Sequence, residues 1–168
     1  MKIPVFVSSP TTLNTSQENA RKRIVKLLDE LGFEPRALGR SDYPSDFPLK
    51  EVLVIAKHCA GGVILGFEQF YTDSGTWKRG AKKEENQLGG IIFPTAWNNL
   101  EAGMLYSLKK PLIVFKESNI KGGIFDSGAS DVFVHQMPIG TMTNESKQAL
   151  KETLLNWQRK VRSNYYDE

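Results

Sequence analysis

The chain has 168 residues, of which 40% are hydrophobic and 24% are charged, and its formal net charge at pH 7 is +3. This composition is that of an ordinary globular protein and excludes a wholly disordered chain. No apolar run approaches the ~18 residues that cross a bilayer, and the first ten residues lack the layout of a signal peptide. We therefore expect one domain over residues 1–168, located in the cytoplasm, with neither a membrane nor a nucleic-acid partner.

Metal and thiol chemistry are not expected from this sequence. Cys59 is the single cysteine, so no intrachain disulfide can form, and no base partner for a thiol nucleophile can be identified. The two histidines, His58 and His135, are not spaced from Cys59 as the ligands of a metal site usually are. We expect no metal and no cofactor.

Short apolar runs alternate with amphipathic segments along most of the chain. The strands are expected at residues 2–8, 33–38, 63–67, 111–115 and 132–134, and the helices at residues 16–31, 48–59, 99–109 and 144–162. This order predicts an α/β fold with a doubly wound, mostly parallel five-stranded sheet of flavodoxin-like order. In such sheets ligands bind beyond the carboxyl ends of the strands.

Residues 68–93 show no persistent periodicity and contain four glycines among mixed charges. A stretch of this length without clear elements is typically a functional loop or lid. We expect it to be mobile without ligand and to lie over the cleft.

The loop after the first strand, which begins with Ser8, Ser9 and Pro10, offers hydroxyls and free amides before a helix N-terminus. These groups suit a phosphate or a ribose, although they could equally cap the helix. The turn lacks both Gly-x-Gly-x-x-Gly and the P-loop motif, which argues against a Rossmann dehydrogenase and a P-loop NTPase. In the next loop, Asp42 and Asp46 are either ribose ligands or solvated turn residues.

Glu101 is predicted to lie in the first turn of a helix at the ligand edge of the sheet, where the helix dipole favours its ionised form. A carboxylate that faces C1′ of a ribosyl group can stabilise an oxocarbenium-like transition state or attack it as a nucleophile. The alternative is a capping box, with Asn98 as the N-cap residue and Glu101 three residues later. Gly103 in the same helix would allow close approach to a strand.

Three segments carry a resemblance to a known family: Val5-Phe-Val-Ser-Ser-Pro, Gly62-Val-Ile-Leu-Gly-Phe, and Asn99-Leu-Glu-Ala-Gly followed by Lys110-Pro-Leu-Ile-Val-Phe. Together they resemble the nucleoside 2-deoxyribosyltransferase-like superfamily. That superfamily includes deoxynucleoside-monophosphate N-glycosidases and is similar in fold to Toll/interleukin-receptor (TIR) domains that hydrolyse NAD. Its catalytic carboxylate is the Glu of an Asn/Thr-x-x-Glu-x-Gly pattern before a Lys-Pro-hydrophobic strand. The resemblance therefore implies that Glu101 is catalytic.

The chain departs from the family pattern at two places. Gly66-Phe67-Glu68 stands where family members usually have an Asp after the third strand, so Glu68 is at best a substitute. Residues 95–98 replace the usual run of small residues before the catalytic Glu. Trp97 in that segment could stack on a base or anchor the loop by packing.

The leading hypothesis is an enzyme that cleaves or transfers the N-glycosidic bond of a nucleoside, nucleotide or NAD-like substrate. Its catalytic residue is Glu101, and the expected substrate-binding residues are Ser8, Ser9, Pro10, Gly66, Phe67, Trp97 and Asn98. One alternative is a non-catalytic sensor that binds a nucleotide-derived signal in the same cleft. Another is a TIR-like scaffold that self-associates. The expected partner is a small-molecule nucleoside or nucleotide, and a homo-oligomer of the chain is left open.

Overall fold

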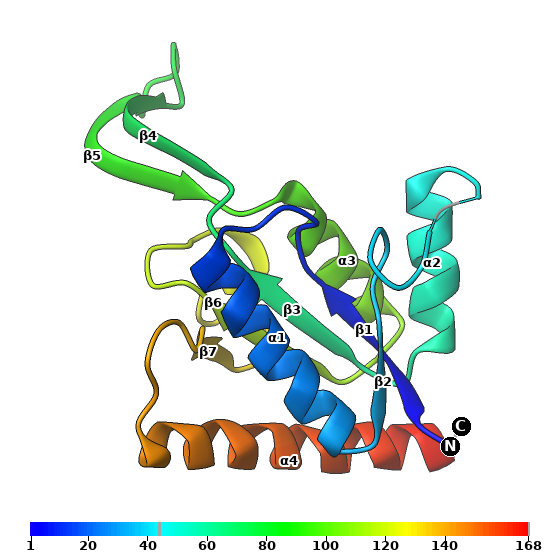
Figure 1. Cartoon of the computed structure of the whole chain (residues 1–168). Helices are drawn as coiled ribbons and strands as arrows, with labels where there is room; N and C mark the ends of the chain where they lie inside the picture. The colour runs from blue at the N-terminus through cyan, green and yellow to red at the C-terminus, as the bar shows by residue number, and fades with distance from the viewer. Residues whose placement is uncertain (44, 168) are drawn as a thin grey trace.

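The computed structural model describes residues 1–43 and 45–167; Pro44, in the loop that carries Asp42 and Asp46, lies outside the described residues. Five parallel strands form the central sheet in the order β2-β1-β3-β6-β7 (Figure 1). They are β1 (Ile3–Ser8), β2 (Phe33–Arg36), β3 (Gly62–Gly66), β6 (Leu112–Lys116) and β7 (Val134–Gln136). Numbered within this sheet, the order is 2-1-3-4-5, which is the flavodoxin-like order. The predicted fold class is confirmed.

Helices cover both faces of the sheet, because successive strand residues point to opposite sides. The helices are α1 (Thr15–Glu30), α2 (Pro48–His58), α3 (Ala96–Ser107) and α4 (Asn144–Asp167), with a short 3-10 helix η1 (Gly123–Phe125). Val5 and Val7 belong to the hydrophobic core under α1 and α4, whereas Phe6 between them belongs to the core under α2 and α3. No helix among the described residues is long and apolar enough to cross a membrane.

Several element boundaries differ from the expected ones. The N-cap of α1 is Asn14 and not Ser16: its side chain accepts the Gln17 N–H at 2.9 Å, and the Gln17 side chain accepts the Asn14 N–H at 3.1 Å. This reciprocal capping box satisfies two backbone donors, which a single serine at position 16 would not. β2 ends at Arg36, β7 begins two residues later than expected, and α4 continues to Asp167.

The segment 68–93 folds as a β-hairpin, whereas its sequence pattern predicts a loop without regular elements. β4 (Phe70–Trp77) and β5 (Glu85–Phe93) pair antiparallel, and the Gln69 N–H donates to the Phe93 carbonyl at 2.9 Å where the hairpin meets the body. Most of its residues are exposed, so the pair lacks the apolar alternation that marks a strand in sequence. The hairpin projects away from the sheet (Figure 1).

Two glycines have opposite surroundings. A Cβ on Gly66, at the end of β3, would lie 2.5 Å from the ring of Phe125, which packs against the strand there. Gly103 is exposed, and a Cβ on it would meet no atom within 4 Å. The expectation that Gly103 lets α3 approach a strand is therefore wrong.

These surroundings predict opposite effects of the same substitution on the free energy of unfolding. We expect Gly66→Ala to lower it by about 1–3 kcal/mol, since the added methyl group must displace the Phe125 ring. We expect Gly103→Ala to raise it by about 0.5–1 kcal/mol, since alanine restricts the unfolded chain and favours the helix. Urea denaturation of both variants measures the difference. Equal effects would contradict the packing described for Gly66.

Candidate active site

A cavity of about 350 Å³ lies at the carboxyl edge of the sheet. Its lining comes from the loops after β1 and β2, the first residues of α2 and α3, and the base of the hairpin. The lining residues are Ser9, Pro10, Thr11, Leu38, Gly39, Pro48, Gln69, Thr95, Trp97 and Glu101. This is the edge at which doubly wound sheets bind ligands, and the volume is within the ~300–1,000 Å³ of small-molecule sites.

The position at which α3 begins determines which face of the helix carries the Glu101 side chain. Thr95 is the N-cap residue, and its hydroxyl accepts the Trp97 N–H at 3.3 Å. Asn98 and Glu101 therefore form no capping box, and Glu101 lies in the second turn of the helix and not in the first. Both side chains are on the buried face of α3, together with Ala102 and Leu105. The capping interpretation of Glu101 is wrong, and so is its placement in the first turn.

Glu101 is a buried carboxyl group that nevertheless reaches the cavity. Its exposed fraction is 8%. Burial raises its pKa to about 7, and the hydrogen bond from Ser8 partly opposes that shift by stabilising the ionised form. At neutral pH Glu101 is therefore divided between its charged and neutral states. A desolvated carboxyl group with such a pKa at the edge of a cavity is a candidate functional group.

The hydrogen bond from Ser8 to Glu101 has a defined direction. The Asn98 Nδ2 atom is a donor and lies 2.8 Å from Ser8 Oγ, so the hydroxyl oxygen accepts this bond. The single hydroxyl proton of Ser8 is then left for the Glu101 carboxylate. Ser8 and Asn98 are 1% and 0% exposed, so this chain of bonds lies behind the carboxyl group, on the side away from the cavity opening.

The predicted site residues divide into three groups. Ser9, Pro10, Trp97 and Glu101 line the cavity. Ser8 and Asn98 contact the site from behind through the bonds just described. Gly66 and Phe67 are not brought to the cavity: Gly66 packs on Phe125, and the Phe67 ring is 0% exposed in the hydrophobic core. Phe67 therefore does not offer a face to a base.

Trp97 supplies the aromatic surface of the cavity. Its side chain is 40% exposed at the start of α3, whereas a ring that only anchored the loop would be buried. The hydroxyl groups of Ser9, Thr11 and Thr95 and the amide of Gln69 lie in the same lining. The cavity thus combines a flat apolar face, several hydrogen-bonding groups and one titratable acid.

The hairpin contributes little to this cavity. Among the described residues, Gln69 at its base is in the lining, while the strands β4 and β5 contribute none of it. The prediction that residues 68–93 lie over the cleft is therefore wrong. The reason is the pairing of β4 with β5, which directs the chain outward as a separate two-stranded sheet.

The side chains that hold the loops of the site carry no local signal in the sequence. Arg40 donates to the Pro10 carbonyl at 2.8 Å and pairs with Glu18 at 3.1 Å. Glu117, just after β6, accepts from the Gln17 side chain at 2.7 Å and from the Glu68 N–H at 2.8 Å. Their partners are 22 to 100 residues away, so no local pattern identifies them.

Other candidates are engaged elsewhere or inert. Asp42 forms a two-oxygen pair with Arg36, and Arg36 lowers the Asp42 pKa. Asp46 pairs with Lys50 on the surface. Cys59 is 2% exposed, and burial raises the pKa of its thiol to about 12, so it is protonated at neutral pH.

The raised pKa of Glu101 makes the stability of the protein depend on pH. The folded state binds more protons than the unfolded state between pH 4.5 and about 7. The stabilisation from protonated Glu101 is therefore complete below pH 4.5 and is lost as pH rises through 7. Glu101→Gln lacks this dependence. We expect the stability of the parent relative to the variant to fall by about 3 kcal/mol from pH 4.5 to pH 8, measured by urea denaturation. Parallel pH profiles would show that burial does not perturb this group.

Removing the Ser8 hydroxyl tests the direction of the hydrogen-bonded chain. Ser8→Ala deletes the donor that favours ionised Glu101, so we expect the Glu101 pKa to rise further above its ordinary value. Carbon-13 NMR titration of the glutamate carboxyl groups measures this directly. Ser9→Ala is the matched control, because the Ser9 hydroxyl bonds the Pro10 carbonyl at 3.4 Å. Equal Glu101 pKa values in the parent and both variants would show that Ser8 does not hydrogen-bond the Glu101 carboxylate.

Solved structures that are similar in fold to this chain include an N-glycosidase and a flavoprotein. No family model and no curated protein sequence matches the chain. The fold is similar to the CMP N-glycosidase BcmB of Clostridium botulinum, with a TM-score of 0.49 and 16% identity over 90% of this chain and 98% of that one. It is similar to the same degree, with a TM-score of 0.49, to diflavin flavoprotein A3 of Nostoc sp., with 13% identity over 99% of this chain and 96% of that one. Neither likeness is strong enough to assign a function.

Proposed function

We propose that the protein cleaves or transfers the N-glycosidic bond of a nucleoside, nucleotide or NAD-like substrate, with Glu101 as the reacting carboxylate. One observation carries the proposal: Glu101 is desolvated, does not cap its helix, and reaches a cavity at the ligand edge of the sheet. Its burial costs stability and its side chain is not needed to begin α3. A role in chemistry accounts for both facts.

Burial makes Glu101 selective for a developing positive charge. Cleavage of an N-glycosidic bond places positive charge on the sugar ring, as in the oxocarbenium-like transition states of glycosidases. A carboxylate with little water around it interacts with such a charge more strongly than a solvated one does. The neutral sugar of a bound substrate offers no comparable charge. Glu101 is therefore poised to stabilise the transition state more than the ground state, which is the condition for catalysis.

Two roles are open to the carboxylate, and both need its ionised form. It can attack C1′ as the bond from C1′ to the base nitrogen breaks, which forms a covalent sugar ester, or it can stabilise the cation while water attacks. In both cases the base leaves with the electron pair of the broken bond and becomes protonated. Ser8 supports either role by donating to the carboxylate from behind, which leaves the second oxygen for the sugar. On this basis activity should rise with pH as Glu101 ionises near pH 7.

The rest of the cavity suits the leaving base and the sugar. The exposed face of Trp97 can stack on a nucleobase or a nicotinamide ring. The hydroxyl groups of Ser9, Thr11 and Thr95 can bond the sugar hydroxyls or a phosphate. These groups lie around Glu101 in one lining, which is the arrangement that positions a substrate for attack.

The same cavity also supports a sensor that binds a nucleotide-derived signal without cleaving it. The raised pKa of about 7 favours this alternative, because the neutral Glu101 present near pH 7 donates a hydrogen bond and is not a nucleophile. A sensor would bind the ligand and release it unchanged. Product analysis separates the two functions.

The test is release of free base from deoxynucleosides, deoxynucleoside monophosphates and NAD, followed by chromatography. We expect Glu101→Gln to slow release at least about 100-fold, because the amide keeps the shape but cannot carry the negative charge. The fold should survive this isosteric change.

Glu68→Gln is the matched control. Glu68 lies at the same edge of the sheet and stands nearest to the Asp of the family pattern, but it is not in the cavity lining. Its activity should stay close to that of the parent. Full activity in Glu101→Gln would reject Glu101 as the reacting group. Tight binding of one of these compounds without release of base would favour the sensor.

A further inference from the structure

The two helical layers of the molecule differ in what they expose to water. α1 and α4 cover one face of the sheet, and α2 and α3 cover the other (Figure 1). Among the described residues of α1 and α4, Tyr166 is the one large apolar side chain that is exposed. The shorter layer of α2 and α3 exposes several such side chains, which are Phe47, Leu49, Val54, Trp97, Leu100 and Tyr106. A gathering of this kind on one face is typical of a surface that binds another protein.

The outer face of α3 carries no charge. Ala96, Leu100, Gly103 and Ser107 are exposed and follow one another at intervals of four, three and four residues, so they form one line along the helix. Glu101 is the one charged residue of α3, all of which the structure describes, and it lies on the buried face. A helix without a charged outer face is typically covered by other parts of a protein or an assembly.

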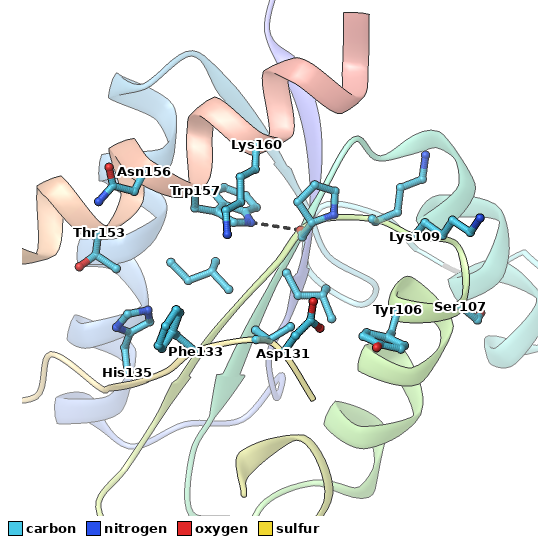
Figure 2. Close-up of a pocket in the computed structure, with 15 residues that line it drawn as sticks. Tyr106, Ser107, Lys109, Asp131, Phe133, His135, Thr153, Asn156, Trp157 and Lys160 are labelled. Carbon is cyan, nitrogen blue, oxygen red and sulfur yellow. Dashed lines mark hydrogen bonds between the residues drawn. The ribbon is translucent and has the colours of Figure 1, made fainter. Parts of the chain in front are cut away.

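The two sides of this face have different surroundings. Met104 packs against the core that α2 and α3 share. Tyr106 lies on the other side, next to the segment that carries Asp131 (Figure 2). Trp97, at the start of α3, also lines the Glu101 cavity. A partner that covers this face would therefore lie beside the cavity.

The line of exposed residues is symmetric about a point midway between Leu100 and Gly103. If a second copy packs antiparallel about that point, Leu100 of each copy meets Gly103 of the other, and Ala96 meets Ser107. Leu100 is 43% exposed, and a Cβ on Gly103 would meet no atom within 4 Å. The projecting side chain and the open space for it are thus on the same face. A twofold interface requires this self-complementarity, because both copies use the same surface.

The exposed apolar area is sufficient for a dimer. Phe47, Leu49, Val54, Trp97 and Leu100 together expose roughly 500 Å² of apolar side chain per copy. Since about 60% of an interface is apolar, this corresponds to about 800 Å² per copy, which is the size of a standard stable interface. The exposed lysines of the layer, Lys50 and Lys57, are on α2, and Lys50 pairs with Asp46. No like charges therefore face each other across the line on α3.

We propose that the outer face of α3, with the neighbouring exposed side chains of α2, is a homodimer interface. Two copies pack α3 antiparallel about a twofold axis between Leu100 and Gly103, and each copy lies against the Trp97 side of the other's Glu101 cavity. The proposal does not depend on catalysis by Glu101.

Size-exclusion chromatography with light scattering tests the assembly. We expect the parent to have twice the mass of the chain at a concentration of about 50 μM. Leu100→Glu should raise the dissociation constant of the dimer at least about 100-fold, because it places two buried carboxylates at the axis. Gly103→Leu should raise it at least about tenfold, because the larger side chain fills the space that Leu100 of the partner needs. Both positions are exposed, so the circular dichroism of the monomer should not change.

Leu88→Glu is the matched control. Leu88 is an exposed leucine in β5 of the hairpin, away from α3. This variant should dimerise as the parent does. Loss of the dimer in Leu88→Glu, with an unchanged dimer in Leu100→Glu, would assign association to the hairpin and reject the α3 interface.

Cross-linking tests the antiparallel arrangement. A mixture of the Ala96→Cys and Ser107→Cys variants should be joined by a short bis-maleimide much faster than either variant alone. In each variant alone the two new cysteines are separated by about 16 Å along the helix pair. Cys59 is buried and its thiol is protonated, so it should not react.

Three outcomes would overturn the proposal: a parent that stays monomeric at about 50 μM, a dimer that Leu100→Glu and Gly103→Leu leave unchanged, or cross-linking of Ser107→Cys alone as fast as that of the mixture. Base release by the parent and by Glu101→Gln is measured separately. Failure of the dimer would therefore leave the proposed function standing, and failure of the proposed function would leave the dimer standing.

Discussion

The position at which α3 begins is the constraint on which the candidate active site depends. Thr95 caps the helix, so Asn98 and Glu101 fall on the inward face, one turn apart, beside the end of β1. A helix that began at Asn98 would have used both side chains to bond backbone N–H groups. Because the Thr95 hydroxyl caps the helix instead, the Asn98 amide is available to donate to Ser8 and orient it. The Glu101 carboxyl group is then desolvated between the sheet edge and the cavity.

The loops around this carboxyl group are held by bonds to backbone atoms. Arg40 donates to the carbonyl of Pro10, Gln69 donates to that of Thr12 at 3.3 Å, and the Asn99 side chain accepts the Ile124 N–H at 2.8 Å. Backbone groups tied in this way cannot turn freely, so the lining is formed before a ligand arrives. A site of this kind does not have to pay the cost of ordering its loops on binding.

The fold could be predicted from the sequence because its signals are local. The continuous apolar runs of β3 and β6 and the periodic helices α1 and α4 are typical of a parallel sheet covered on both faces. The hairpin was missed because its strands are exposed on both sides and interrupted by glycine, so they carry no apolar alternation. The cap of α3 was misplaced by three residues, since Asn98 and Thr95 are both good N-cap residues and only packing decides between them.

The site was predictable in its position and in part of its lining. Topology alone brings the loop after β1 and the start of α3 together, and Glu101 with Ser9 follows from that. The predictions for Gly66 and Phe67 are wrong about burial: both are close in sequence to the sheet edge, but Phe125 covers Gly66 and the Phe67 ring is buried in the core. Whether a residue at a strand end is buried depends on what packs above it. Gly66 is covered by Phe125, which lies 59 residues later in the sequence. No pattern within the strand contains that information.

The hairpin has a consequence for engineering this protein. Its two ends meet at the bond between Gln69 and Phe93, so the chain leaves and re-enters the body at one point. The turn between Trp77 and Glu85 lies at the far end of the two strands and is exposed. Exposed turns that few contacts tie to the core tolerate inserted sequence well. A peptide tag or a fluorescent label placed in this turn would lie away from the Glu101 cavity, whose lining takes only Gln69 from the described residues of this segment.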